Sequence, residues 1–448
     1  MAGTNFASQF SADVEAFIAE ETLPLARRQL VVYQFGDPLV LPKGRGTTYT
    51  ATRYNRIPLP FQTLSEGVKP AGQSMTISQV SATAQQWGDT ITITDVAEMT
   101  IKHPLFKKGI ELMALQVAET TERNTFNALM AGTQINYVNT RGSRAALVAG
   151  DVLNPHEVNR AAAVLQTLGA PRYAGDERTD MRIDAQKDSA NASENPRRMP
   201  HYVAVIHPLV AGDMRENSTV VQAWTYSDLN RLYNYELGEW GGIRFCFSNM
   251  VPSFTGVAQV TGTPGTAGAL ATNNYFVRVT AVDTANQYEA LLYQVSGSLA
   301  VTGPNGSIAV TVPATAGFTY NVYVGLTSSP TNLGLAVAGP TTGPMAGQAT
   351  QIAPGATAVI TGIGVAQTPP AAPATGVVVY PTLIFGRGAY GQVVLDDTKF
   401  SYIKDADKSD PLNQLRVMGW KMFYGTIILN QAFFMRIEST SAFSATFG

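Results

Sequence analysis

The chain of 448 residues carries 31 Lys and Arg against 33 Asp and Glu, a formal net charge of −2. Charged residues make up 14% of the chain, well below the usual quarter or so, so we expect much of the surface to lie in contacts. Sequence-specific binding of nucleic acid is not expected, because phosphate contacts need a basic footprint and no basic run exceeds two residues. The single cysteine, Cys246, excludes an intrachain disulfide and fits a reducing compartment. With no signal pattern at the start and no apolar run near ~18 residues, the sequence predicts a cytoplasmic product outside any membrane.

Residues 1–45 predict an N-terminal arm. Ser11 is placed to cap a short amphipathic helix that Pro24 interrupts. From Arg27 to Leu41 the pattern becomes extended. We expect this arm to reach a neighbouring molecule rather than pack on its own domain.

The following stretch, residues 46–95, predicts a long two-stranded arm. One strand runs from Thr47 to Arg56, and the return combines Met75–Val80 with Gly88–Thr94, with β-branched residues at alternate positions. An isolated ribbon of two strands is at best marginally stable in water. Another molecule is therefore expected to support this arm.

A long helix follows the arm. Asp95 and Glu98 have the spacing of a capping box with Asp95 as the N-cap, and Pro104 then restarts a helical pattern that continues to Met130. Apolar residues recur along it at helical spacing. The residues expected on its solvent side are Glu111, Glu119, Glu122 and Arg123.

Shorter elements are predicted between this helix and residue 253. Asn154 caps a helix that reaches Leu168, and Pro208 begins another. His201–Ile206 and Trp240–Phe245 read as strands. The polar residues 172–198 predict a surface loop.

The composition changes abruptly over residues 254–376. Between Thr255 and Thr375 the only charged residues are Arg278, Asp283 and Glu289, and short alternating apolar runs recur. This pattern indicates a β-sandwich of immunoglobulin or fibronectin type, inserted into a loop of the main fold. The prolines that follow it, over 369–373, predict a semi-rigid spacer.

The closing part, Leu383 to Phe447, is rich in strand patterns and contains no long helix. It is predicted to form the sheet that packs on the long helix. The chain as a whole thus predicts an α+β fold with an inserted all-β sandwich.

No pattern predicts an active site. Gly386–Gly391 matches a dinucleotide-binding string, but a strand follows it where a helix is required, so a glycine-bearing turn is expected. Asp405–Asp410 begins like a calcium loop and then departs from it. Cys246 lies in a strand pattern and is expected in the core. Four histidines lack metal-ligand spacing and are expected in turns and caps: His103, His156, His201 and His207. We predict no catalytic, cofactor-binding or metal-binding residue and no enzymatic activity.

Three parts of the sequence resemble a known family. They are Gly88–Ile93 before the long helix, His201–Pro208 together with Gly238–Phe245, and Gly419–Lys421 near the end. With the order of the segments, they resemble the major capsid protein of tailed bacteriophages with the Hong Kong ninety-seven capsid fold, and more closely its N-four-like family. The resemblance covers most of the chain except about 254–376, which the basic fold does not require.

The resemblance implies a role for each segment. The extended loop would lie over the adjacent subunit, and its inter-subunit contacts would include Arg53, Arg56, Phe61, Glu66 and Lys69. The implied segments are an N-terminal arm (1–45), an extended loop (46–95), a peripheral domain with the spine helix (96–199), an axial domain (200–253), the immunoglobulin-like insertion (254–376), and return strands of the axial and peripheral domains (377–448).

The same resemblance implies a self-assembling protein. Hexamers and pentamers would build an icosahedral shell around double-stranded DNA, which a mildly acidic subunit would hold non-specifically. Scaffolding, portal and decoration proteins would be further partners, and neither a cofactor nor a membrane would be involved. The protein would reside in the virion capsid after assembly in the host cytoplasm.

Two alternative functions stay open. An encapsulin-type shell protein shares the fold and encloses protein cargo, although the length and the inserted sandwich argue against it. A fibronectin-module adhesin or polysaccharide-binding protein would need a signal peptide and an aromatic or carboxylate site. For the sandwich itself, a stabilising or decorating surface domain is favoured over attachment to host glycans.

Overall fold

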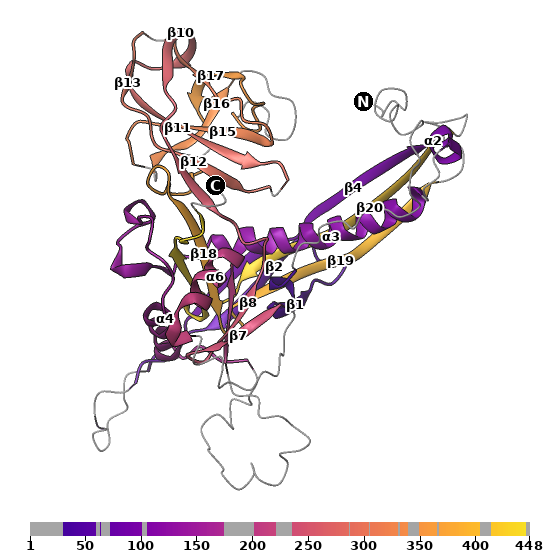
Figure 1. Ribbon diagram of the computed structural model, residues 1–448, viewed down its shortest axis with the longest axis vertical. Helices are drawn as coiled ribbons and strands as arrows, with labels where there is room; N and C mark the ends of the chain where they lie inside the picture. Colours follow the sequence, from indigo (N-terminus) through magenta and orange to yellow (C-terminus); the bar gives the residue numbers. More distant parts are fainter. Residues whose placement is uncertain are drawn as a thin grey trace. The chain divides into compact units, whose positions relative to one another are not determined.

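The computed structural model describes residues 30–59, 63, 72–100, 105–173, 201–220, 235–285, 287–303, 305–329, 332–338, 349–364, 367–403 and 414–444. The chain forms two compact units, drawn in Figure 1. The first combines residues 1–125 with 390–429, and the second combines 126–389 with 430–448. The division falls inside the longest helix, which contributes to both units.

A four-stranded sheet forms the centre of the first unit, in the order β1-β19-β20-β4. Only β1 and β19 run parallel; the other neighbours are antiparallel. The predicted closing sheet is confirmed only for residues 390–428, because the strands at 378–385 and 434–439 belong to the sheet of the second unit. The strands are β1 (Asp37–Val40), β4 (Gln85–Thr94), β19 (Tyr390–Ile403) and β20 (Leu415–Ile428).

Helix α3 (Leu105–Met130) lies along one face of this sheet (Figure 1). Its Met113 packs into a buried cluster with residues of β20, and Trp420 Nε1 donates to Gln116 Oε1 at 2.9 Å. The predicted long helix and its end at Met130 are confirmed. The predicted solvent side is wrong for Glu122 and Arg123, which are 0% and 6% exposed.

The two-stranded ribbon is shorter than predicted. β2 (Thr48–Tyr54) pairs with β3 (Ile77–Thr83), but the expected return strand at Gly88–Thr94 belongs to β4, which pairs with β20 instead. Trp87, Ile91 and Ile93 pack with the cluster beneath α3. Their period-two pattern therefore reflects one buried sheet face, not a free arm.

The predicted capping box before the long helix is wrong. Short helix α2 (Asp95–Thr100) follows β4, and the N–H of Ala97 donates to Thr94 Oγ1 at 3.3 Å, which makes Thr94 the capping residue. Glu98 does not complete the box, because its carboxylate forms an ion pair with Arg416 of β20. The residues between α2 and α3, including His103 and Pro104, lie outside the described residues.

The main body of the second unit is a mixed sheet in the order β9-β18-β6-β8-β7, with β21 on β18 and β5 on β21. The predicted strand at 201–206 is confirmed, whereas residues 240–245 contain the end of β7, a two-residue turn and the start of β8. The strands are β5 (Ile135–Tyr137), β6 (Tyr202–Ile206), β7 (Glu236–Trp240), β8 (Ile243–Phe247), β9 (Phe254–Val257), β18 (Val378–Phe385) and β21 (Phe434–Ser439).

Two capped helices pack on this sheet and share its core. The Asn154 side chain accepts from the Glu157 N–H at 3.0 Å at the start of α4 (Pro155–Thr167), and His207 Nδ1 accepts from the Leu209 N–H at the start of α6 (Pro208–Glu216). Both predicted helix starts are confirmed.

The chain also has 3₁₀ turns at η1 (Val32–Phe35), η2 (Val138–Thr140), η3 (Arg144–Ala146) and η5 (Gln431–Phe433).

In its described residues the inserted segment consists of strands and connecting turns, and the predicted short strands are present. They pair as β10-β14-β17-β16 and as β12-β11-β15-β16 around one apolar cluster. Of the three charged residues, Arg278 is buried and donates through Nε to the Tyr293 carbonyl at 2.9 Å. The strands are β10 (Gly262–Leu270), β11 (Asn273–Asp283), β12 (Glu289–Tyr293), β13 (Leu299–Val301), β14 (Gly306–Thr311), β15 (Phe318–Gly325), β16 (Gly334–Ala338) and β17 (Thr357–Ile363).

The predicted proline spacer after the insertion is wrong. Pro369 and Pro373 are buried, and the Pro373 carbonyl accepts from the Gln294 side chain at 2.5 Å. A Cβ on Gly256 would lie 2.1 Å from the Ala374 carbonyl oxygen, so the backbones approach closely there. The segment is packed against the sandwich because apolar proline rings are more stable buried than in water.

Candidate assembly surfaces

The ribbon β2–β3 presents the sequence-predicted contact residues to solvent. Arg53 in β2 and Arg56 just beyond it are exposed. The outer half also exposes apolar side chains that were not predicted, with Tyr54 70%, Leu59 69% and Met75 69% exposed. Their signal in the sequence was large apolar residues within an otherwise polar hairpin. Three predicted contact residues, Phe61, Glu66 and Lys69, lie outside the described residues.

The base of the ribbon, by contrast, is fixed to its own sheet. The Ala84 N–H donates to the Thr47 carbonyl at 2.8 Å, and Tyr49 and Val80 pack with the buried Val393 of β19. Beyond this base both faces of the ribbon are largely exposed. Exposed apolar side chains on a hairpin of marginal intrinsic stability mark a surface suited to contact with another molecule.

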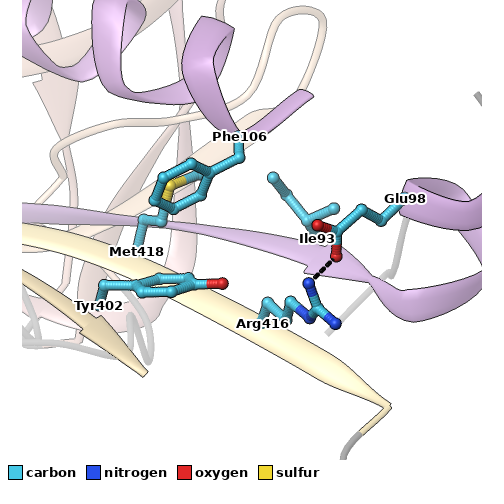
Figure 2. Close-up of a pocket in the computed structure, with 6 residues that line it drawn as sticks. All are labelled: Ile93, Glu98, Phe106, Tyr402, Arg416 and Met418. Atoms are coloured by element: carbon cyan, nitrogen blue, oxygen red, sulfur yellow. Dashed lines mark ion pairs between the residues drawn. The ribbon is translucent and has the colours of Figure 1, made fainter. Parts of the chain in front are cut away.

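A second apolar surface lies at the far end of the same unit, where α3 begins. Figure 2 shows Phe106 of α3 against Tyr402 of β19, with ring centroids 4.7 Å apart. The ion pair between Glu98 and Arg416 closes one side of a shallow pocket, and Met418 forms part of its lining. The neighbouring exposed apolar residues are Ile110, Phe400, Ile403 and Leu415.

Glu122 of α3 anchors the start of the described chain. Its Oε1 accepts from the N–H groups of Val31 and Val32 at 2.7 Å each, and its Oε2 accepts from the Tyr33 N–H at 2.9 Å. Burial raises the pKa of Glu122 above its ordinary value, whereas the three N–H donors and Arg123 act in the opposite direction. Residues 31–41 therefore pack on their own unit, and the expectation that this part of the arm reaches a neighbour is wrong.

A buried group of charges holds the second unit together. Arg144 of η3 donates to both carboxylate oxygens of Glu438 in β21, at 2.7 and 2.5 Å, and Arg436 Nε lies 3.0 Å from the same carboxylate. Glu438 is 0% exposed. A fully buried carboxylate held between two guanidinium groups fits a structural element, because each charge is compensated inside the protein.

An ion pair between the partly exposed Arg141 and the buried Asp151 lies close by in the sequence. Asp151 accepts from Arg141 Nε at 2.9 Å, from Asn139 Nδ2 at 2.8 Å and from the Val148 N–H at 2.9 Å. Although burial acts to raise it, these hydrogen bonds hold the pKa of Asp151 below its ordinary value.

The residues singled out for possible chemistry have structural surroundings. Cys246 is fully buried in β8, where burial raises its thiol pKa to about 12. His207 stacks on Tyr380 with centroids 4.6 Å apart, and burial lowers its pKa to about 4. The glycine-rich string at 386–391 forms the turn between β18 and β19, as predicted, with Gly388 at φ +73°. The calcium-like run at 405–410 lies outside the described residues.

Neither metal ligands nor membrane helices are found in the described ranges. Across those residues, no group of three or more His, Cys, Asp or Glu side chains is arranged to hold a metal ion. In the same part of the chain, no helix combines the length and apolar character needed to cross a lipid bilayer.

Comparison with known proteins shows which solved structures share this fold. No protein-family model and no curated protein sequence matches the chain. Among solved structures, it is similar to a chain of the capsid asymmetric unit of cyanophage Pam1, with a TM-score of 0.51 and 9% identity over 99% of this chain and 100% of that one. It is also similar to the capsid of Ralstonia phage GP4, with a TM-score of 0.50 and 10% identity over 98% of each chain. The chain therefore has the α+β fold of these tailed-phage capsid proteins, and the predicted fold class is confirmed.

Proposed function

We propose that the protein is the major capsid protein of a tailed bacteriophage and belongs to the N-four-like family. Many copies assemble into an icosahedral shell that encloses double-stranded DNA, and the role is structural rather than enzymatic. The observation that carries this proposal is a capsid fold spanning essentially the whole chain, combined with the exposed apolar side chains Tyr54, Leu59 and Met75 on the described outer half of the ribbon. Such an apolar surface is more stable when a neighbouring subunit covers it.

The proposal assigns the segments as the sequence suggested. Residues 46–95 are the extended loop, 96–199 the peripheral domain, 200–253 the axial domain and 377–448 the return strands. Residues 1–45 keep the role of an N-terminal arm, with contact to a neighbour restricted to the part before Val31. Pairing of β18 with β6 supports a shared axial sheet, and packing of α3 on β20 supports the peripheral assignment.

The insertion at 254–376 is proposed to be an immunoglobulin-like domain. Its pairing order supports this assignment, because β10–β14 corresponds to strands B and E and β11–β15–β16 to strands C, F and G of the immunoglobulin pattern. One departure is β17, the last strand, which pairs with both β14 and β16. We assign the inserted domain a decorating or stabilising role on the shell.

The proposed partners are hexamers and pentamers of the same chain, with scaffolding, portal and decoration proteins, and DNA held without sequence preference. Assembly takes place in the host cytoplasm. An encapsulin-type shell is the second candidate, supported only by a shared fold. Particles that contain DNA favour the capsid, and particles that contain one protein cargo favour the encapsulin.

The test is a truncation of the ribbon that leaves its base intact. Thr52 and Gln79 are direct partners across the hairpin, so residues 53–78 can be replaced by Asn-Gly, which forms a two-residue turn. Strand β4 must be kept, because it belongs to the central sheet. Both chains are expressed, and their high-mass fractions are examined by negative-stain electron microscopy.

Full-length protein is expected to form shells or rings, and the truncated chain is expected to remain folded without forming them. Circular dichroism and the melting temperature check the fold of the truncated chain. Shells of the same size and yield from both chains would contradict the proposed role of the ribbon.

A further inference from the structure

One short strand joins the inserted sandwich to the main body of the second unit. Thr255 of β9 pairs with Val378 of β18, in the main body, and in parallel with Leu291 of β12, in the sandwich. The Gly256 N–H donates to the Val377 carbonyl at 2.9 Å. The same backbone segment is therefore hydrogen-bonded on both sides, and the insertion continues the sheet of the main body.

Arg144 lies where the entering and the leaving chain of the insertion meet the main body. Its guanidinium carbon is 4.4 Å from the centroid of the Phe254 ring, at the entry, and Nη1 donates to the Ala371 carbonyl at 2.9 Å, at the exit. The other two nitrogen atoms of the guanidinium, Nε and Nη2, donate hydrogen bonds to the carboxylate of Glu438 in β21. One side chain thus contacts both connections of the insertion and a strand of the main body.

Glu438, a residue of the main body, fixes the orientation of the Arg144 guanidinium. A bidentate arginine–carboxylate pair has a defined geometry, and Glu438 is itself fixed by Arg436. With Nε and Nη2 committed, the plane of the group and the direction of Nη1 are determined, because guanidinium is rigid and planar. Arg144 is only 5% exposed, so water does not compete for these contacts.

We infer that Arg144 is a positioning residue that locks the inserted sandwich to the main body in one orientation. It does so by joining the Phe254 ring and the Ala371 carbonyl to the buried Glu438. If the proposed capsid function is correct, on which this consequence rests, every copy in a shell displays the sandwich at the same angle rather than on a flexible stalk.

The test is hydrogen exchange, measured by mass spectrometry on the full-length chain. Arg144→Lys keeps the charge beside Glu438 but lacks the fork and the flat face, and Phe254→Leu removes the ring while leaving the buried ion pair intact. Arg141→Lys is the matched control, since Arg141 lies three residues before Arg144 in the chain and pairs with Asp151 instead of Glu438.

Both variants are expected to speed exchange at 254–257 and 371–378 by about tenfold, with changes below about threefold in β21 and in β11 of the sandwich. The control is expected to leave the two junctions unchanged. Junctions that exchange at the wild-type rate in the folded variants would overturn the inference, as would a uniform acceleration throughout the second unit in Phe254→Leu. Phe254→Leu keeps the test decisive if Arg144→Lys fails to fold.

This readout does not depend on assembly. Particle formation by the same variants is followed separately by electron microscopy, so that failure of the inference and failure of the capsid proposal are distinguishable.

Discussion

Replacing Glu122 by alanine is expected to release the segment around residues 31–33 from the long helix. The carboxylate accepts three backbone N–H groups, and two of them belong to Val31 and Val32, which are fully buried. A buried N–H that loses its acceptor costs about 1–3 kcal/mol. Removing a buried charge offsets part of that cost. We therefore expect a net loss of about 2–4 kcal/mol in the free energy of local opening.

The variant could also avoid the unsatisfied N–H groups if the segment around residues 31–35 detached from the unit, and the free energy of that detachment sets an upper limit on the cost of the substitution. Val31, Val32 and Phe35 would then be exposed, at about 1.5–3 kcal/mol each for a fully buried apolar side chain. Detachment is therefore no cheaper than keeping the segment in place with unsatisfied N–H groups. Local opening, rather than global unfolding, is the quantity to measure, because the chain has two units and a single unfolding free energy is poorly defined.

Hydrogen exchange of residues 31–35 in the full-length chain gives this quantity. Glu111→Ala is the matched control, because it makes the same change on the same helix at an exposed ion pair with Lys108, worth at most about 1 kcal/mol. If Glu122→Ala accelerated exchange at 31–35 no more than Glu111→Ala, the reasoning about this anchor would be refuted.

Three further predictions concern the second unit. Gly256→Ala is expected to lower the free energy of local opening at 254–257 by about 2 kcal/mol or more, because its Cβ would meet the Ala374 carbonyl. Hydrogen exchange checks this, with Gly297→Ala, which meets nothing within 4 Å, as a near-neutral control. Native Cys246 is expected to resist alkylation at about pH 8 and to react after unfolding, because its raised pKa and burial keep the thiol protonated and inaccessible; rapid native labelling, measured by mass spectrometry, would contradict this. Since the pKa of Asp151 is lowered in the folded state, its stabilising contribution is present above its ordinary value of 3.8 and is lost as the pH falls through the lowered value. Urea midpoints of Asp151→Asn are thus expected to fall less steeply with acid than those of the unaltered chain; parallel curves would disprove this contribution.

The assembly surfaces could be predicted only in part. The alternating pattern indicated a ribbon, and Arg53 and Arg56 lie exposed on it as expected. The exposed Tyr54, Leu59 and Met75 were not predicted, although each is a large apolar residue in an otherwise polar hairpin. For Glu122 a signal existed, since it lies four residues before the buried Phe126 and seven before the buried Leu129, which places it on the apolar face of the helix.

What the sequence determined by itself was local. The periodicity of apolar residues defined α3, the strands β6 and β20, and the strands of the insertion, and the loss of charge marked where the insertion begins and ends. Side-chain caps such as Asn154 could also be predicted from the sequence, because the capping residue and its partner are three positions apart. These features depend on neighbours within one turn or one strand.

Only the tertiary structure decided which distant segments meet. The partner of β4 is β20 and not β2, Glu122 accepts from a residue 91 positions away, and Arg144 pairs with Glu438 at a separation of 294. The same alternating pattern suits a free ribbon and a sheet edge equally well. The choice between them depends on which apolar faces bury each other, and a buried carboxylate is stable only where the fold brings donors to it.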